Sequence, residues 1–255
     1  MTLIITDQTD VAQLMNTQPF GGCRHPDDYK GPPCASEPDD KDLIPWAEFP
    51  DRIADMERSK TTLVDIWAQS PIGKPMQSYL NYCWTWCVVD AMLVFREAEG
   101  LPYVPLSPSS VAGPIMNFAN VGGWPEQALD WIMKHGVAPV SHVPYVTTNP
   151  REFKAEWQKE ALKFRISKFE NVGKNKQRIG SKLLTRKPLC SAFMFMEHAM
   201  APLALTDDNP RLPVDEPTRY GLRVLNSHND GIMKLEGRRA MPDSAFAIAQ
   251  TNFAG

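Results

Sequence analysis

The run from Cys83 to Glu99 restricts the possible folds of this chain more than any other segment. Its side chains are apolar at almost every position and leave only a narrow polar stripe. A helix that is apolar on nearly all sides is buried inside a protein. Gly100 is a suitable residue to end such a helix, and Pro102 follows it. The sequence therefore predicts a central helix around which the other elements must pack.

The remaining patterns place most helices before the strands. Further helices are predicted within 46–69, near Val111, and over 125–135, 151–163 and 174–186. Strands are predicted over 164–169, 189–196, 198–205, 220–226, 231–235 and 245–249. Such a succession is typical of an α+β fold. The polar, proline-rich segment 206–218 is predicted to be a surface loop.

Charge and hydropathy argue against several classes of partner. The net charge of −3 and the pI near 6.0 disfavour nucleic acid or an anionic membrane as the main partner. No apolar run reaches the roughly 18 residues of a membrane-spanning helix. The N-terminal residues also lack the basic and apolar regions of a secretory signal. We expect a protein that binds neither nucleic acid nor membrane and is not exported.

Residues 1 to about 42 are polar and punctuated by prolines, which predicts an extended or partly disordered arm. Cys23 and Cys34 lie in this arm with His25 nearby. A zinc site would need a fourth ligand at motif spacing, a disulfide would join the two cysteines, and a reducing compartment would favour free thiols. Free thiols are the favoured alternative. The other three cysteines lie in apolar runs typical of a core: Cys83, Cys87 and Cys190.

Cys83 stands at the start of the predicted central helix, where a thiolate is stabilised by unpaired N–H groups and the helix dipole. Gln77 lies six positions upstream, and its amide could donate to the oxyanion formed when a thiolate attacks a carbonyl. A thiol nucleophile also needs a base and a group that orients the base. His198 and Asn226, in or at the end of predicted strands, could supply them. Taken alone, Cys83 is better explained as a buried core thiol.

Five motifs occur in sequence along the chain: Gln77, Cys83-Trp84, Gly122-Gly123-Trp124-Pro125, Glu197-His198 and Asn226-Ser227. In this order they resemble the papain-like cysteine peptidases, over most of the chain from about Gln77. Two segments are similar to members of that family encoded by tailed bacteriophages: Pro105-Leu-Ser-Pro-Ser-Ser-Val-Ala and Asn120-Val-Gly-Gly-Trp. The resemblance implies a protein or peptide substrate. The phage likeness implies virion proteins as further partners and a location in the host-cell cytoplasm or the virion.

The resemblance implies an α+β, papain-like fold of two lobes with the active-site cleft between them. A helical lobe would span about 77–163 and a β-rich lobe about 164–255, after an N-terminal segment 1–76. The implied roles are nucleophile for Cys83, base for His198, orienting residue for Asn226 and oxyanion donor for Gln77. The reaction would need no cofactor and no metal.

The resemblance also implies a set of substrate-binding residues: Trp84, Gly122, Gly123, Trp124, Pro125 and Glu197. Gly123 would hydrogen-bond the substrate backbone, which requires a close approach and therefore no Cβ. Trp124 and Pro125 would line the pocket for the side chain two positions before the scissile bond. The two glycines could equally form only a turn, and Pro125 also suits the first position of a helix.

The sequence departs from the family at several positions. His228 stands where the family has a tryptophan that covers the hydrogen bond between asparagine and histidine, and Leu80 replaces a disulfide-forming cysteine. If His228 leaves the bond between Asn226 and His198 open to water, that bond is weakened and peptidase activity is expected to be weak. The interval of 115 residues from Cys83 to His198 is also shorter than the roughly 130–150 residues of papain and the cathepsins.

Three functions stay open at this point. The first is an active cysteine peptidase, the second is a structural or binding component of a virion with weak or lost activity, and the third is an amidase acting on a non-peptide or cell-wall amide. The segment 1–76 could pack on the body, bind a partner or inhibit the enzyme. Structural packing is the favoured role for this segment.

Overall fold

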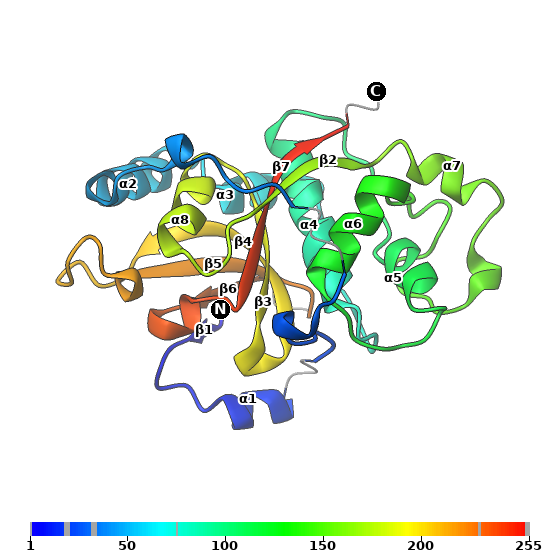
Figure 1. The fold of residues 1–255 in the computed structure, drawn as a ribbon, viewed down its shortest axis with the longest axis horizontal. Helices are drawn as coiled ribbons and strands as arrows, with labels where there is room; N and C mark the ends of the chain where they lie inside the picture. Colours follow the sequence, from blue (N-terminus) through cyan, green and yellow to red (C-terminus); the bar gives the residue numbers. More distant parts are fainter. Residues whose placement is uncertain (1, 18–20, 32–34, 75, 229–230, 253–255) are drawn as a thin grey trace.

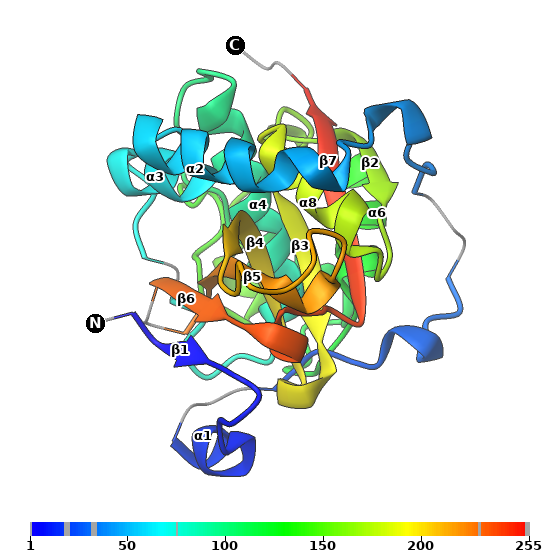
Figure 2. The same ribbon diagram turned by 90° about the vertical axis from the view of Figure 1, so that its left-hand side faces the viewer.

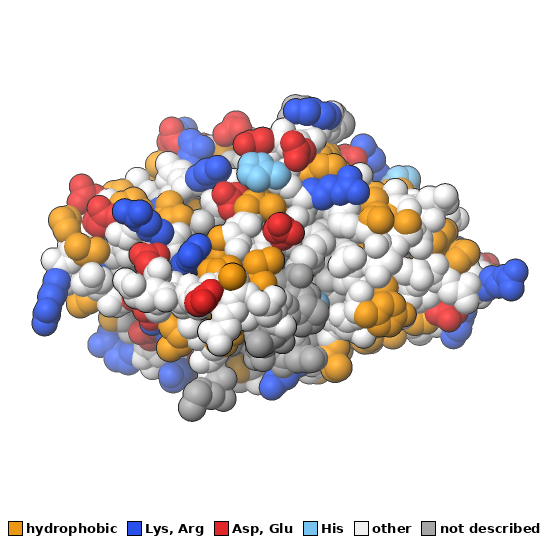
Figure 3. All heavy atoms as spheres, turned by 90° about the horizontal axis from the view of Figure 1, so that it is seen from below, with side chains coloured by type: hydrophobic (Ala, Val, Ile, Leu, Met, Phe, Trp, Pro, Cys, Tyr) orange, Lys and Arg blue, Asp and Glu red, His pale blue; other side chains and the backbone are white. Residues whose placement is uncertain are grey.

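The computed structural model describes residues 2–17, 21–31, 35–74, 76–228 and 231–252. A helical region and a sheet-bearing region lie side by side (Figure 1). On the face in Figure 3, acidic and basic side chains of the described residues are interspersed, in keeping with the small net charge of −3. No helix in the described ranges is long and apolar enough to cross a membrane.

The predicted central helix is present as α4, Cys83–Ala98, and every residue from Cys83 to Arg96 is buried. It packs against strand β4, His198–Asp207, and against helices α3, Leu63–Gln69, and α6, Pro125–His135. Burial on several sides explains why the sequence carries almost no polar face here. The prediction of a buried helix is confirmed.

Within the described residues, seven strands form one sheet in the order β1-β6-β5-β4-β3-β7-β2. Neighbouring strands run antiparallel except for β1 and β6, which are parallel. The bounds of the other strands are β1 Ile4–Ile5, β2 Ile166–Asn171, β3 Leu189–Phe193, β5 Tyr220–Asn226, β6 Gly231–Leu235 and β7 Ser244–Thr251. The predictions for β5 and β6 were correct at both ends, and those for the others, except the unpredicted β1, differ by a few residues.

The other helices are α1 Val11–Thr17, α2 Phe49–Ser59, α5 Ser109–Ile115, α7 Trp157–Ala161 and α8 Lys176–Leu184. In Figure 2, α2, α3 and α8 lie in the upper part of the view and α1 lies at the bottom, near β1. Apolar side chains of α1, α2 and α8 pack in one cluster, whereas those of α3 pack with α4 in another. The helix predicted over 151–163 is shorter than expected. Glu156 adopts a left-handed conformation (φ 65°), so the chain before it forms only a short 3-10 turn, Pro150–Glu152.

The N-terminal arm carries more structure than the sequence predicts. Strand β1 pairs with β6 at the sheet edge, where Leu3 and Ile5 accept hydrogen bonds from Lys234 and Glu236 (both 2.9 Å). Ile5 is fully buried. Polar composition gave no sign of this, because the pairing uses backbone groups and one buried side chain rather than a periodic pattern.

A second apolar cluster lies beside α2 and α8, and it depends on a glycine. Phe49 of α2 is fully buried, and a Cβ built on Gly180 of α8 would overlap its ring. We expect Gly180→Ala to lower the free energy of unfolding by about 1–3 kcal/mol, because overpacking forces neighbouring groups apart. Urea unfolding measures this, and Gly73→Ala, whose Cβ would meet no atom within 4 Å, is the control. Equal stability of the two variants would contradict the close packing.

Candidate active site

Cys83 is the first residue of α4 and is fully buried. Burial raises the pKa of the thiol to about 12, and a backbone hydrogen bond from Ala199 opposes that rise. This hydrogen bond places the sulfur against the start of β4, in the β-rich region. Ala199 directly follows His198. The packing of α4 on β4 therefore brings the thiol beside the histidine segment.

His198 begins β4 and Asn226 ends β5, and these two strands are antiparallel neighbours. The hydrogen bond predicted between them is present, with Nε2 of His198 2.9 Å from Oδ1 of Asn226. The same oxygen accepts the backbone N–H of His228 at 3.2 Å, and Nδ2 of Asn226 lies 2.9 Å from Sδ of Met233. Asn226 can therefore hold the imidazole ring in one orientation, with Nδ1 as the nitrogen that can serve a thiol.

Gln77 is buried and tied to the segment that follows Asn226. Its backbone N–H donates to the Ser227 carbonyl (2.8 Å), and its Oε1 accepts the Ser227 hydroxyl (2.6 Å). One side-chain N–H donates to the carbonyl of Leu80. The second N–H is the one that an oxyanion would require, and this role stays a prediction.

The loop before Cys83 is fixed by Asn120. Its Oδ1 accepts the backbone N–H of Asn81 (2.7 Å), and its Nδ2 donates to the carbonyl of Tyr79 (3.2 Å). Trp84 is fully buried, and a Cβ on Gly123 would lie 2.7 Å from its ring. The packing of the Trp84 ring therefore requires glycine at 123, and a hydrogen bond from Gly123 to a substrate backbone stays a prediction.

Part of the N-terminal arm, Gly21–His25, crosses the space between the two regions, and we call it the cleft segment. Its residues 22 and 24 exchange backbone hydrogen bonds with Gly123, from Gly123 N–H to the Gly22 carbonyl and from Arg24 N–H to the Gly123 carbonyl (both 2.9 Å). Cys23 N–H donates to the carbonyl of Glu197 on the opposite side (3.0 Å). The cleft segment therefore bridges Gly123 and the residue before His198.

The thiol and Trp124 also contact this segment. Sγ of Cys83 donates a long hydrogen bond to the Gly21 carbonyl (3.4 Å), and Nε1 of Trp124 donates to the His25 carbonyl (2.8 Å). The Arg24 guanidinium lies 4.9 Å from the centre of the Trp124 ring. Of the predicted binding residues, Gly123, Trp124 and Glu197 thus contact the chain's own arm. Pro125 is buried and is the first residue of α6. It therefore has the helix-starting position that the sequence offered as the alternative to a substrate-binding role.

The cleft segment fits only because glycine stands at position 22 and, opposite it, at position 122. Gly22 has a φ of +98°, and a Cβ on it would lie 2.7 Å from the Asn81 carbonyl oxygen. A Cβ on Gly122 would lie 2.5 Å from the Gly22 carbonyl oxygen. Side chains at either position would push the segment away from the thiol.

Comparison with known proteins shows which fold this chain has. Residues 76–202 match the sequence model of the papain family of cysteine proteases. Together with the two-region architecture and its structural likenesses, this decides the fold. The fold is papain-like.

Three solved structures illustrate the similarity of this fold to papain-like proteins. Procathepsin B S9 from Trypanosoma congolense shares 12% identity at a TM-score of 0.63, over 89% of this chain and 85% of that one. Xylellain, a cysteine protease from Xylella fastidiosa, shares 14% at 0.58, over 73% and 84%. Digestive procathepsin L 3 from the Tenebrio molitor larval midgut shares 11% at 0.56, over 80% and 90%. No curated protein matches the chain in sequence.

Both titrating groups at this papain-like site are neutral at pH 7. Burial raises the pKa of Cys83 to about 12. Burial first, and then the neighbouring His228, lower the pKa of His198 to about 3, so the site holds a neutral thiol and a neutral imidazole. The ion pair expected of an active papain-like enzyme is therefore disfavoured while the cleft segment covers the site, because charged groups are poorly stabilised away from water.

The expectation that water reaches the bond between His198 and Asn226 is wrong for this closed structure. His198 and Asn226 are fully buried, and His228 is only 4% exposed. The His228 ring centre lies 5.0 Å from that of His198, so His228 itself helps to cover the bond. The bond between His198 and Asn226 is covered in this structure, and weak peptidase activity stays a prediction.

Acid should destabilise the closed papain-like structure. The folded pKa values of His198 (about 3) and His228 (about 4, lowered by burial) lie below the ordinary 6.5, so the unfolded chain binds more protons and stability falls as pH drops from 6.5. We expect a loss of about 2 kcal/mol per histidine by pH 5, since one pKa unit is about 1.4 kcal/mol. Thermal melting of wild type and His228→Phe tests this. A smaller loss in the variant is expected, and a pH-independent melting temperature would contradict it.

Sequence reasoning missed the cleft segment and Glu126. The Gly21-Gly22 pair before Cys23 was the available signal, although a glycine pair alone predicts only a turn. Glu126 of α6 is 9% exposed, and burial raises its pKa to about 7. Burial is also the main reason that the pKa of Cys23 is raised, with smaller contributions from Cys83 and Glu126. Cys23 is a free thiol, and Cys34 lies outside the described residues. Among the described residues, no three His, Cys, Asp or Glu side chains could hold a metal ion.

Proposed function

We propose that this protein is a papain-like cysteine peptidase that cleaves peptide bonds through a Cys83 thioester, and that the cleft segment holds it in a latent state. One observation carries the proposal. A length of peptide backbone lies between Gly123 and Glu197, within hydrogen-bonding distance of the Cys83 thiol. The cleft therefore has the backbone donors and acceptors needed to hold an extended peptide beside a nucleophile.

The reaction follows from the residues present. His198 takes the proton of Cys83, and the thiolate forms a bond to the carbonyl carbon of the scissile peptide. The oxyanion accepts hydrogen bonds from the Cys83 backbone N–H and the second side-chain N–H of Gln77. His198 then gives its proton to the leaving amine as the C–N bond breaks. Water, deprotonated by His198, hydrolyses the thioester and restores the thiol, while Asn226 keeps the ring oriented.

The latent state has two physical supports. The cleft segment pairs with Gly123 in the parallel sense, and it presents the Gly21 carbonyl oxygen, rather than its carbon, to the thiol as a hydrogen-bond acceptor. Burial also keeps the thiol protonated, as the raised pKa of Cys83 indicates. A neutral thiol is a poor nucleophile, so the segment is held without being cleaved.

We further propose a phage-encoded protein that acts in the host cytoplasm or the virion on phage or bacterial proteins. The support is the likeness of 105–112 and 120–124 to phage members of the family. A virion component with lost activity is the second candidate, favoured by the neutral, covered pair of Cys83 and His198. An amidase acting on a cell-wall amide is the third.

Labelling and substrate profiling separate these functions. A thiol-directed epoxide should modify Cys83 once the cleft segment is displaced, as mass spectrometry of the labelled peptide would show. A peptide library should then yield cleavage products that are absent with Cys83→Ala. Displaced protein that resists the epoxide would support the inert virion component. Labelling without peptide cleavage, but with release of cell-wall fragments, would support the amidase.

A further inference from the structure

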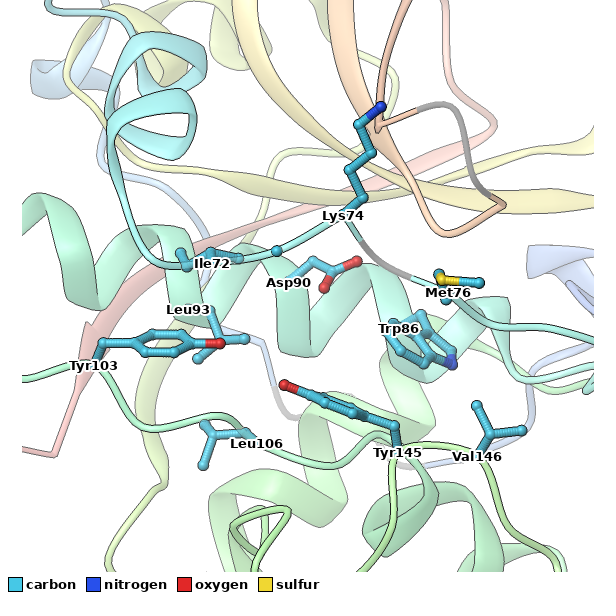
Figure 4. A pocket seen from close by; sticks show the side chains of 11 residues that line it. Ile72, Lys74, Met76, Trp86, Asp90, Leu93, Tyr103, Leu106, Tyr145 and Val146 are labelled. Carbon is cyan, nitrogen blue, oxygen red and sulfur yellow. The ribbon is translucent and has the colours of Figure 1, made fainter.

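A cavity lies along α4, beyond the turn that carries Cys83. Its volume is about 290 Å³, and its lining comes from α4, from the segment before Gln77 and from two loops. The lining includes six side chains that define its chemistry: Lys74, Trp86, Asp90, Tyr103, Leu106 and Tyr145 (Figure 4). None of these residues belongs to the proposed catalytic set or the cleft segment, so the cavity is a separate feature.

Asp90 places a buried carboxyl group at this cavity. It is 3% exposed, and its Oδ2 has no hydrogen-bond partner among the described residues. In Figure 4 its carboxyl group and the hydroxyl groups of Tyr103 and Tyr145 converge on the same space. Ionising a buried carboxyl group that lacks a partner lowers the stability of the fold by several kcal/mol. The presence of Asp90 on an otherwise apolar helix therefore needs an explanation.

A nearby lysine, Lys74, does not neutralise Asp90 in this structure. Lys74 lies at the rim of the cavity, and in Figure 4 its ammonium group points away from Asp90. The rest of the lining is aromatic and aliphatic. Trp86 and Tyr145 stack with their ring centres 5.9 Å apart at 24°, and Leu106 is fully buried.

We propose that this cavity binds a small organic cation, with a primary ammonium group on Asp90 and the hydrocarbon part against Trp86, Tyr145 and Leu106. A carboxylate in a water-poor space is stabilised by one positive charge at contact distance. Aromatic faces attract cations, and the apolar wall favours an alkyl chain over a bare metal ion. The volume suits a ligand of a few heavy atoms.

Binding should depend on pH in a defined direction. Burial raises the pKa of Asp90 well above its ordinary value, and a cation bound at the carboxylate would oppose that rise and favour loss of the proton. Affinity should therefore increase with pH until the ligand amine itself loses its proton. The other titratable groups around Asp90 are Tyr103, Tyr145 and Cys87, with Lys74 at the rim of the cavity. Burial raises the pKa values of Cys87 and Tyr145 above their ordinary values, so neither group gains a charge between about pH 5 and 8.

Calorimetry with n-butylammonium tests the site directly. We expect saturable binding to the wild-type chain, release of a proton detected by comparing two buffers, and at least tenfold weaker binding of n-butanol, which has the same chain without the charge. This comparison needs no variant. Absence of saturable n-butylammonium binding, or equal binding of n-butanol, would overturn the proposal.

Variants identify the carboxyl group. Asp90→Asn should weaken n-butylammonium binding at least tenfold and raise the melting temperature of the empty protein, because a buried ionisable group is removed. Asp55→Asn, an exposed aspartate of α2, is the matched control and should change neither. Lys74→Met should leave binding equal or stronger. Unchanged affinity in Asp90→Asn, or loss of affinity in Lys74→Met, would refute the assignment.

Discussion

Replacing Gly22 with alanine is expected to raise the rate at which iodoacetamide alkylates Cys83 near pH 7 by about 100-fold or more. The new methyl group would meet the Asn81 carbonyl oxygen at 2.7 Å, on a backbone with a φ of +98°. The cleft segment must then leave its place between Gly123 and Glu197. Water reaches the thiol, whose pKa falls from about 12 toward the ordinary value of about 8.5, so the reactive thiolate becomes far more abundant.

The measurement is the rate of label incorporation at Cys83, followed by mass spectrometry. Gly73→Ala, whose Cβ meets nothing within 4 Å, serves as the matched control and should alkylate at the wild-type rate. The melting temperature of each variant shows whether the body stays folded. A folded Gly22→Ala protein that alkylates no faster than wild type would remove the cleft segment as the cause of latency.

Removal of the imidazole should have a still larger effect on catalysis. In the Gly22→Ala background, His198→Ala is expected to lower kcat/KM for a peptide substrate by about 10³-fold or more, the range found when one member of a catalytic triad is removed. His198 is the base that the Asn226 hydrogen bond holds in place (2.9 Å). Without it, nothing at the site removes the thiol proton near neutral pH.

A control and a second readout separate chemistry from folding. His135→Ala removes an exposed imidazole at the end of α6 and should keep full activity. The remaining activity of His198→Ala should increase with pH as the thiol ionises without help, whereas that of the parent should not follow the same curve. Equal kcat/KM values for His198→Ala and its parent would refute the role of His198 as the base.

Local sequence patterns determined the elements that depend on burial. The central helix begins at Cys83 as predicted, and α6, β5 and β6 have the predicted bounds. Each of these elements buries side chains whose spacing is written in the sequence, so periodicity finds them. The order of the motifs also indicated which residues would meet, and the hydrogen bond between His198 and Asn226 is present because β4 and β5 are neighbours.

Only the tertiary structure decided which residues cover the candidate active site and which residues line the cavity along α4. The cleft segment is held mainly by backbone groups of residues 22–25, which every sequence possesses, so no local pattern marks it. His228 was expected to expose a hydrogen bond, and its burial instead depends on how the segment after β5 packs. Asp90 looked like part of a narrow polar stripe. Its isolation beside an apolar cavity follows from long-range packing of α4 against two loops, which residue spacing along one helix does not specify.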